Sequence, residues 1–176
     1  MERVIKRVAI FDFDGTLIDT PQPSEAKIKY EQVTGNEWPH KGWWSKKESL
    51  DVDIFDMPVI QSVYEAYKRE KATPNTLVVM MTGRIGKLGK IVEKILQENG
   101  MEFDEYQYKN GRFGPDTLDF KLGMMAEYLE RFPELESMAM WEDRHIHAGE
   151  FKNWGLKQKD ILFEVTLVPS TRDNVS

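Results

Sequence analysis

The stretch of sequence that decides the fold is Val8-Ala9-Ile10-Phe11-Asp12-Phe13-Asp14-Gly15-Thr16-Leu17. Its first four residues form a short apolar run, which predicts a buried strand. The run ends on two carboxylates two residues apart, Asp12 and Asp14, and then on a glycine that permits a tight backbone turn. An ordinary Asp-Gly turn is the plainest interpretation of such a pattern. The apolar strand before the pair and the Thr-Leu after it favour a functional loop at a strand end.

Apolar runs elsewhere predict further strands that alternate with helices. Strands are expected at residues 77–81, 137–141 and 161–168, with a weaker candidate at 101–108. Helices are expected over 88–96, 117–131 and 145–153, and another beginning at Asp56-Met57-Pro58 with Asp56 as its N-cap. Residues 20–55 show no regular pattern. The alternation predicts an α/β fold, a three-layer Rossmann-like parallel sheet covered by helices on both faces.

Three of the predicted strands end abruptly in polar residues. The first ends on Asp12 and Asp14, the second on Thr82-Gly83-Arg84, and a third on Glu142-Asp143-Arg144. Ligands of open parallel sheets bind beyond the carboxyl ends of the strands. We therefore expect these distant segments to converge at one edge of the sheet and to form a site there.

The residue types at this edge suit phosphoryl transfer. One carboxylate of an Asp-x-Asp pair can attack phosphorus, and the other can pass a proton to the leaving oxygen. Thr82 can donate a hydrogen bond to a phosphoryl oxygen and Arg84 can clamp one, although taken alone a strand end followed by a helix cap explains these residues better. Lys121, in the predicted helix over 117–131, can neutralise phosphoryl charge, although a lone helix lysine is usually solvated.

Carboxylates at the same edge indicate a magnesium site. Mg²⁺ takes hard oxygen ligands and keeps several waters. Glu142 and Asp143, with Asp12 and the backbone carbonyl of Asp14, would complete such a site; the alternative is a surface charge cluster. His145 and His147 are two residues apart, so they do not share a helix face, and we expect a structural or substrate-facing role for them.

Composition limits the class of protein. The 176 residues carry a formal net charge of -6, with no cysteine, which disfavours binding to an extended nucleic-acid duplex and excludes disulfides and thiolate zinc sites. No apolar stretch approaches the length that spans a bilayer, and residues 1–7 do not resemble a signal peptide. These features predict a cytoplasmic protein that is a monomer or homodimer and has no membrane partner.

The chain resembles the haloacid dehalogenase-like (HAD) hydrolase superfamily, whose signature is matched by Asp12, Asp14, Gly15, Thr16 and Leu17. The second motif matches Thr82, the third Lys121, with Lys109 as a less favoured substitute, and the fourth Glu142 and Asp143. The resemblance implies that Asp12 is the nucleophile and a Mg²⁺ ligand and that Asp14 is the general acid and base. It implies that Thr82 and Lys121 hold the phosphoryl group. Asp143, more than Glu142, would ligate the metal, because the family more commonly has Asp-Asp or Gly-Asp there.

A narrower resemblance indicates a substrate class. Gly42-Trp43-Trp44, the segment 117–121, and Glu142-Asp143-Arg144 with His147 and Phe151 look like the Swiss Army Knife RNA repair-like subgroup. The Thr-Gly-Arg and Asp-Arg motifs also resemble the phosphatase half of phage polynucleotide kinase-phosphatase. That resemblance implies removal of a 3′-terminal phosphate from a nucleotide or nucleic acid, with Gly83, Arg84 and Arg144 near the substrate.

The interval between the first two motifs predicts a small cap. HAD enzymes often carry a cap there, and we place it at about residues 20–57 of one catalytic domain spanning 1–168, followed by a loose tail at 169–176. Trp43 and Trp44 lie in a stretch with lysine and histidine, which suits a base-stacking platform. Packing of these rings against the main domain explains them equally well.

These observations predict a Mg²⁺-dependent phosphomonoester hydrolase that forms an aspartyl-phosphate. A phosphatase of another small metabolite, such as a sugar phosphate, is the alternative within enzymes. A non-catalytic HAD-like binding domain is the alternative outside them, although such a domain has no physical need for both Asp12 and Asp14. Phosphomutase and dehalogenase chemistry are further possibilities, and Asp14 disfavours the dehalogenase.

Overall fold

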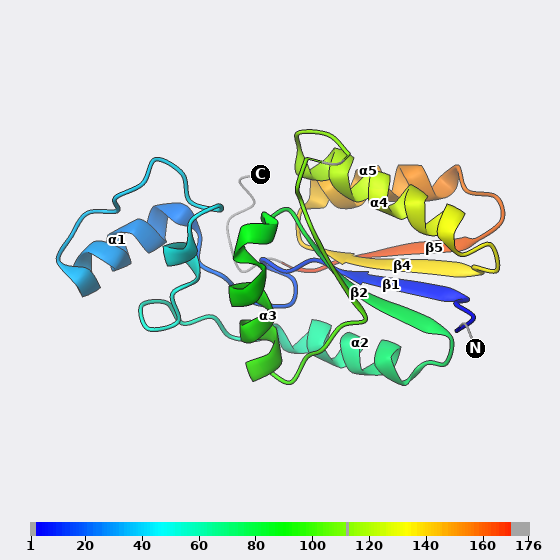
Figure 1. Ribbon diagram of the computed structural model, residues 1–176, viewed down its shortest axis with the longest axis horizontal. Coiled ribbons are helices and arrows are strands. Elements are labelled where there is room, and N and C mark those ends of the chain that lie inside the picture. The colour runs from blue at the N-terminus through cyan, green and yellow to red at the C-terminus, as the bar shows by residue number, and fades with distance from the viewer. Residues whose placement is uncertain (1–2, 112, 170–176) are drawn as a thin grey trace.

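A single parallel sheet forms the centre of the molecule (Figure 1). The computed structural model describes residues 3–111 and 113–169. Its five strands lie in the order β3-β2-β1-β4-β5. Their bounds are Arg7–Phe11 for β1, Thr76–Thr82 for β2, Glu105–Tyr108 for β3, Ser137–Glu142 for β4 and Leu162–Leu167 for β5. The predicted α/β parallel sheet is therefore confirmed. The tail predicted at 169–176 lies, apart from Pro169, outside the described residues.

Two layers of helices cover the sheet. On one face lie α2 (Gln61–Ala72) and α3 (Gly89–Glu98), and on the other α4 (Thr117–Arg131) and α5 (His145–Leu156) (Figure 1). The strands alternate buried apolar side chains between the two faces. Ala9 and Phe11 belong to the core between the sheet and helices α2 and α3, whereas Val8 and Ile10 belong to the core between the sheet and helices α4 and α5. Because both faces of β1 are buried, its sequence is a continuous apolar run.

An insertion leaves the core directly after the first motif and carries α1 (Pro23–Thr34) and the short 3₁₀ helix η1 (Lys47–Leu50). Its two ends meet at backbone hydrogen bonds: the Asp19 N–H donates to the Pro58 carbonyl at 2.8 Å, and the Ile60 N–H to the Leu17 carbonyl at 3.0 Å. Residues 20–57, the predicted cap, lie between these bonds. Figure 1 shows α1 projecting beyond the sheet, on the left of that view.

Two expectations about this segment were wrong. Residues 20–55 contain the twelve-residue helix α1, whose apolar residues do not form one stripe, since Ala26 is buried whereas Ile28 and Val33 are exposed. Pro23 in its first turn and Gly35 at φ 77° after its last residue are the start and stop signals that could have indicated it. No helix begins at Asp56, because Val59 pairs with Ile18 as extended chain; α2 begins at Gln61.

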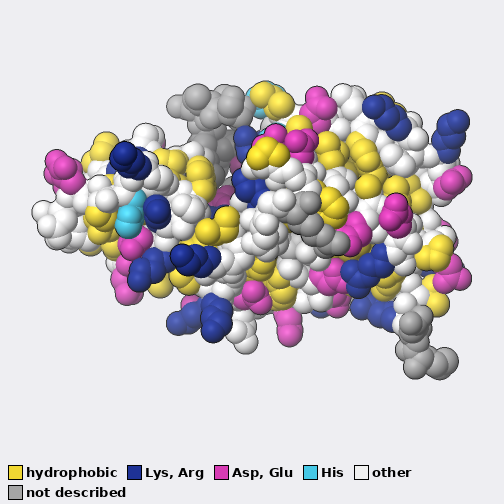
Figure 2. Space-filling model, turned by 45° about the horizontal axis from the view of Figure 1, so that its top comes forward, with side chains coloured by type: hydrophobic (Ala, Val, Ile, Leu, Met, Phe, Trp, Pro, Cys, Tyr) yellow, Lys and Arg dark blue, Asp and Glu magenta, His cyan; other side chains and the backbone are white. Residues whose placement is uncertain are grey.

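The surface carries charges of both signs. On the face drawn in Figure 2, acidic and basic side chains are interspersed, in keeping with a modest net charge of -6. Within the described ranges, none of the helices combines the length and apolar character that crossing a bilayer requires.

Candidate active site

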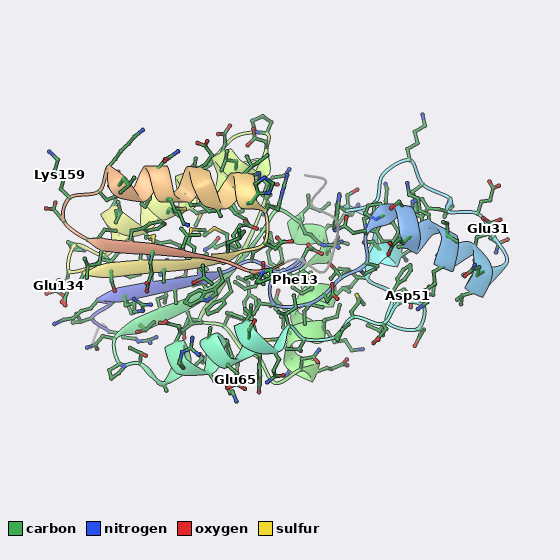
Figure 3. All side chains as sticks on the ribbon, turned by 180° about the vertical axis from the view of Figure 1, so that it is seen from behind. Phe13, Glu31, Asp51, Glu65, Glu134 and Lys159 are labelled. Atoms are coloured by element: carbon green, nitrogen blue, oxygen red, sulfur yellow. The ribbon has the colours of Figure 1, made fainter. Side chains whose placement is uncertain are left out.

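The first motif lies at the end of the sheet that faces the insertion. Figure 3 shows Phe13 at this end, next to the junction with the insertion, whereas Glu134 and Lys159 lie at the opposite end. In β1, Phe11 is in register with Met80 of β2 and Trp141 of β4. The residues that follow these three strands therefore gather at one edge, as the parallel topology predicts.

A buried lysine joins two of the carboxylates at this edge. The Nζ of Lys121 donates to Asp12 Oδ1 and to Glu142 Oε1, both at 2.9 Å. All three side chains are almost completely buried. Burial alone would lower the pKa of Lys121, but the charges of Asp12 and Glu142 raise it well above its usual range, so the lysine is a fixed positive charge. The predicted alternative, Lys109, instead donates its backbone N–H to the Arg84 carbonyl.

The loop after β1 holds Asp12 in place. The Asp12 N–H donates to the Trp141 carbonyl at 3.1 Å, and Thr16 Oγ1 donates to Asp12 Oδ2 at 3.2 Å. Gly15 has φ 72°, a conformation that few other residues adopt, and its N–H closes the turn onto the Ile18 carbonyl at 2.8 Å. The Asp-x-Asp-Gly-Thr sequence thus builds a rigid turn with the Asp12 carboxylate at its start.

Asp12, Glu142 and Asp143 form a cluster of carboxylates whose oxygens lie within 4.8 Å of one another. Burial, and then the charge of Glu142, raises the pKa of Asp12 to about 6. Burial, and then the charges of Asp12 and Glu142, raises the pKa of Asp143 to about 9. For Glu142, burial is outweighed by the Lys121 ammonium, which lowers the pKa below its usual range.

The donor set of this cluster fits a divalent cation. Three carboxylates and one ammonium amount to -3 + 1 = -2 formal charges when all are ionised, and oxygen ligands are those that Mg²⁺ prefers. Glu142 has both oxygens engaged, Oε1 by Lys121 at 2.9 Å and Oε2 by the Asp143 N–H at 3.0 Å. Asp143 is half-buried and is the better placed of the two to offer an oxygen.

Asp14 faces a different set of partners. Its Oδ1 accepts from Thr20 Oγ1 at 2.7 Å and from Arg84 Nη2 at 2.7 Å, and its Oδ2 accepts from Arg84 Nε at 2.9 Å. The remaining nitrogen of Arg84, Nη1, donates to the Trp44 carbonyl at 3.0 Å and to Ser49 Oγ at 2.8 Å. Arg84, only 2% exposed, thus connects Asp14 to the insertion.

The residues that follow β2 are placed by close packing. Thr82 is fully buried, and its Oγ1 accepts from the Arg84 N–H at 3.1 Å. A Cβ on Gly83 would lie 2.4 Å from Thr117 Oγ1, so any larger residue would force the Thr117 side chain at the N-terminus of α4 to move. That close approach is a structural reason for the glycine in the Thr-Gly-Arg motif.

The two predicted stacking rings lie in different environments. Trp43 is 4% exposed and packs against Trp38 and Phe55 inside the insertion. Trp44 is 41% exposed, and its ring lies 5.1 Å from the Arg84 guanidinium carbon. Packing therefore accounts for Trp43, whereas Trp44 presents a ring surface beside the site.

The start of α5 contributes two histidines in its first turn and an arginine, Arg144, as its N-cap residue. His145 and Arg144 are exposed, whereas His147 is buried and its ring meets Phe151 edge-on. Burial, followed by the charges of Arg144 and Lys121, lowers the pKa of His147 to about 4. His147 is therefore neutral near pH 7, and its buried Nδ1 has no hydrogen-bond partner among the described residues.

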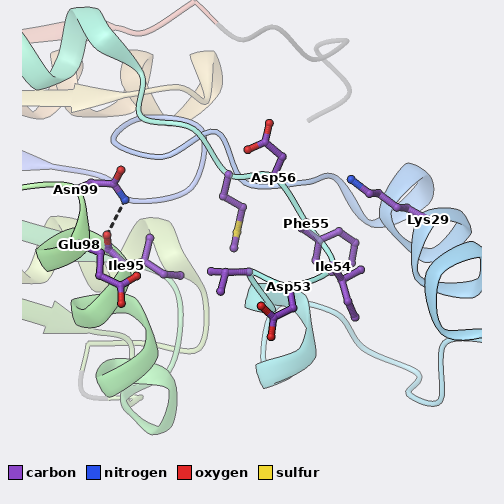
Figure 4. Close-up of a pocket in the computed structure, with 10 residues that line it drawn as sticks. Lys29, Asp53, Ile54, Phe55, Asp56, Ile95, Glu98 and Asn99 are labelled. Carbon is purple, nitrogen blue, oxygen red and sulfur yellow. Dashed lines mark hydrogen bonds between the residues drawn. The ribbon is translucent and has the colours of Figure 1, made fainter.

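A hollow of about 420 Å³ lies between the insertion and α3 (Figure 4). It is lined by residues 52–57 together with Lys29 of α1, Ile95 and Glu98 of α3, and Asn99, which caps the C-terminus of α3. None of these residues is a predicted site residue, so this hollow is distinct from the carboxylate cluster.

Sequence reasoning missed the role of three hydroxyls, on Thr16, Thr20 and Ser49, that hold the candidate catalytic residues in place. Thr16 stands inside the quoted motif and Thr20 follows Ile18-Asp19 directly, so a search for hydroxyls close to Asp12 and Asp14 would have found both. Ser49 carries no such signal, because only the folding of the insertion brings its hydroxyl to Arg84.

The chain is similar to known proteins over most of its length. A curated relative, uncharacterised protein YMR265C of Saccharomyces cerevisiae, is 26% identical over an alignment of 177 positions, and the match covers 87% of this chain and 38% of that protein. A chain in the structure of the Pnkp1/Rnl/Hen1 complex matches with a TM-score of 0.59 at 13% identity, over 94% of this chain and 46% of that one. A putative phosphatase from Clostridium difficile matches with a TM-score of 0.55 at 16% identity, over 93% and 95%.

The fold and the family match define the chain as a HAD domain. More narrowly, the chain belongs to the family described as HAD domain family 1 in Swiss Army Knife RNA repair proteins, whose model matches residues 20–175. The Asp-x-Asp-Gly-Thr motif precedes the matched range, so the motif and the family match are separate observations. The chain spans less than half of the length of the yeast relative and of the Pnkp1/Rnl/Hen1 chain.

Proposed function

We propose that the protein is a Mg²⁺-dependent phosphomonoesterase that acts through an aspartyl-phosphate on the 3′-phosphate of a nucleotide or nucleic-acid end. The observation that carries the proposal is the cluster in which Lys121 bridges Asp12 and Glu142, with Asp143 beside them. A domain used only for binding has no physical need for buried carboxylates held this close together, because their mutual repulsion is costly.

The proposed reaction has two displacement steps at phosphorus. An Asp12 oxygen forms a bond to phosphorus while the bond from phosphorus to the ester oxygen breaks, and Asp14 gives its proton to that leaving oxygen. Water then attacks the phosphorus of the aspartyl-phosphate, Asp14 takes a proton from the water, and inorganic phosphate leaves with Asp12 regenerated. No oxidation occurs, and the net reaction consumes one water.

The other residues of the site hold charge and position. Lys121, and Thr82 through its hydroxyl, would bind phosphoryl oxygens, and the exposed Arg144 would contact the substrate. Mg²⁺ bound by Asp12, Asp143 and the Asp14 backbone carbonyl would neutralise the negative charge of the phosphoryl group. Glu142, whose oxygens already accept from Lys121 and the Asp143 N–H, would orient Lys121.

Two observations support a nucleotide or nucleic-acid substrate. The family is described from RNA repair proteins, and Trp44 offers an exposed ring beside Arg84 on which a base can stack. A phosphatase of another small metabolite is the second candidate. The small size of the insertion favours neither candidate.

The test is phosphate release from a substrate panel with and without Mg²⁺, comparing wild type with Asp12→Asn. We expect Mg²⁺-dependent release that falls at least about 10⁴-fold in Asp12→Asn, as for loss of other nucleophiles. The panel holds an aryl phosphate, 3′- and 5′-nucleotides, oligonucleotides phosphorylated at either end, and sugar phosphates. Glu65→Gln, on the exposed side of α2, is the matched control for loss of one carboxylate charge.

The preferred substrate separates the two candidates. Faster release from 3′-phosphorylated nucleotides and oligonucleotides supports end processing, whereas faster release from sugar phosphates supports a metabolite phosphatase. Full activity of Asp12→Asn would contradict the covalent mechanism.

A further inference from the structure

Arg84 makes contacts that differ from those of a phosphate clamp. All three guanidinium nitrogens face protein acceptors: Nε and Nη2 face Asp14, and Nη1 faces the Trp44 carbonyl and Ser49 Oγ. The side chain is 2% exposed. A guanidinium with its fork filled has no pair of donors left for a phosphate, because it carries five N–H groups in a fixed plane.

The contacts on Asp14 fix the direction of its carboxylate. Oδ1 accepts from Thr20 Oγ1 and from Arg84 Nη2, both at 2.7 Å, while Oδ2 accepts from Arg84 Nε at 2.9 Å. Oδ1 also lies 3.2 Å from Nε. Oδ1 is thus the more heavily engaged oxygen, which makes Oδ2 the oxygen with lone-pair capacity for the proton that moves to and from the substrate.

The contacts on the insertion come from two places in it. Trp44 offers its backbone carbonyl and lays its ring over the guanidinium at 5.1 Å, and Ser49 in η1 offers a buried hydroxyl at 2.8 Å. The same side chain therefore holds the position of the insertion and the direction of Asp14. One rigid guanidinium plane thus carries both the hydrogen bonds to Asp14 and those to the insertion.

We infer that Arg84 is a positioning residue that aligns Asp14 for proton transfer to the leaving oxygen and ties that alignment to the seating of the insertion through Trp44 and Ser49. The inference rests on the proposed function, since it concerns the step in which Asp14 acts. It replaces the direct phosphate contact that the sequence pattern suggested for Arg84.

Substrates whose leaving groups differ in acidity can distinguish a role of Arg84 in proton transfer from a purely structural role. The oxygen of p-nitrophenol leaves without a proton, whereas the 3′-oxygen of a nucleoside needs one. We would measure the rate constant of the first step, by rapid quench or as the burst of released p-nitrophenol, for p-nitrophenyl phosphate and a nucleoside 3′-monophosphate. The variants are Arg84→Lys, which keeps the charge but loses the fork, and Asp14→Asn as the reference for a lost proton donor.

The expected result is a selective loss. In Arg84→Lys the first step should slow by roughly tenfold to hundredfold for the nucleoside phosphate and by less than about threefold for the aryl phosphate. A misaligned acid should cost no more than the lower end of the roughly 10²- to 10⁴-fold that a positioned acid contributes. After its burst, aryl phosphate turnover should be slow, because Asp14 must also accept a proton from water. Asp14→Asn should show the same selectivity to a greater degree.

Two further variants complete the experiment. Lys87→Ala, an exposed residue of the 3₁₀ helix η2 (Gly86–Leu88), should leave both rate constants unchanged. Ser49→Ala removes one contact with the insertion but none with Asp14, so it should change selectivity less than Arg84→Lys does. Circular dichroism and thermal melting establish that each variant is folded.

Specific outcomes overturn the inference. Equal slowing of both substrates in Arg84→Lys, or a raised KM for both with an unchanged first step, would show that Arg84 binds the phosphate or serves the fold alone. If Arg84→Lys gives either result while Asp12→Asn is inactive, the inference about Arg84 is wrong but the proposed phosphatase activity is still supported. An Asp12→Asn variant that stays active would defeat the proposed function itself, whatever Arg84 does.

Discussion

The core and the insertion of this HAD domain are held together in different ways. At the core, β1 lies between two parallel neighbours, and backbone register brings Phe11 opposite Met80 and Trp141. In the insertion, side-chain packing of Tyr30, Trp38, Trp43 and Phe55 replaces a backbone ladder. The core thus places the reacting groups by backbone geometry, whereas the insertion places its residues through a few ring contacts and the bonds to Arg84.

The largest expected effect in this comparison comes from removing the charge at the centre of the core site. Lys121→Met leaves Asp12 and Glu142 buried without their ammonium partner. Breaking a buried pair in this way costs about 3–5 kcal/mol of unfolding free energy. Urea denaturation at pH 7 with EDTA measures it.

A surface pair serves as the control for that loss. Lys68→Met breaks the exposed pair with Glu65, and the expected change is within about 0.5 kcal/mol. Equal losses in the two variants would mean that the buried Lys121 ammonium between Asp12 and Glu142 contributes no more to stability than an exposed pair does.

The next largest effect is a pH dependence of stability that Mg²⁺ should change. The pKa values of Asp12 and Asp143 are raised to about 6 and about 9 from an ordinary value of 3.8. In the metal-free protein, the folded state then binds more protons than the unfolded state across this range. The stability that these groups contribute is complete below pH 3.8 and is lost as pH rises through the two folded values.

A cation that favours the ionised carboxylates should reverse that loss. We expect Mg²⁺ to raise the melting temperature more at pH 8 than at pH 5. At a hundredfold excess of Mg²⁺ over its Kd, the free energy of unfolding should rise by about 2.7 kcal/mol. Thermal melts at both pH values with EDTA or Mg²⁺ measure this effect. Asp143→Asn should lose most of it; an equal shift in that variant would place the ion elsewhere.

The smallest effect is expected in the insertion. Trp44→Ala removes an exposed ring, so KM for a nucleoside 3′-phosphate should rise about fivefold, the lower end of what stacking on one base contributes. KM for a phosphate ester without a base or other ring should not change. Steady-state kinetics with the two substrates measure the difference, and a rise for both would count against stacking.

Much of the core could be predicted from the sequence, because burial leaves a direct pattern there. Continuous apolar runs marked β1, β2 and β4, and the parallel topology then predicted that Asp12 and Glu142 would lie at one edge. Lys121 lies on a helix and was assigned through the family resemblance. The bounds of α4 match the prediction. The helix starts at Thr117, where the Asp116 side chain caps it by accepting from the Asp119 N–H. In such segments, local pattern and tertiary environment agree.

The insertion could not be predicted in the same way. Helix α1 buries only Ala26, so it has no apolar face for a periodicity search to detect. Trp43 and Trp44 are adjacent and chemically identical, yet only the fold decides which ring is buried. The contacts of Arg84 depend on Ser49, thirty-five residues away, and a Thr-Gly-Arg motif does not show whether its arginine faces substrate or protein.

Because the two ends of the insertion are joined by hydrogen bonds, its length and sequence can change in evolution without disturbing the core. Residues 20–57 leave and re-enter the core beside one pair of hydrogen bonds, from Asp19 to Pro58 and from Ile60 to Leu17. Lengthening a segment whose ends are already joined costs little entropy, since each doubling of a loop adds only about 0.6 kcal/mol. Evolution can therefore replace or lengthen residues 20–57 without disturbing the residues at the sheet edge. The part of the chain that selects the substrate can then change independently of the part that carries the reaction.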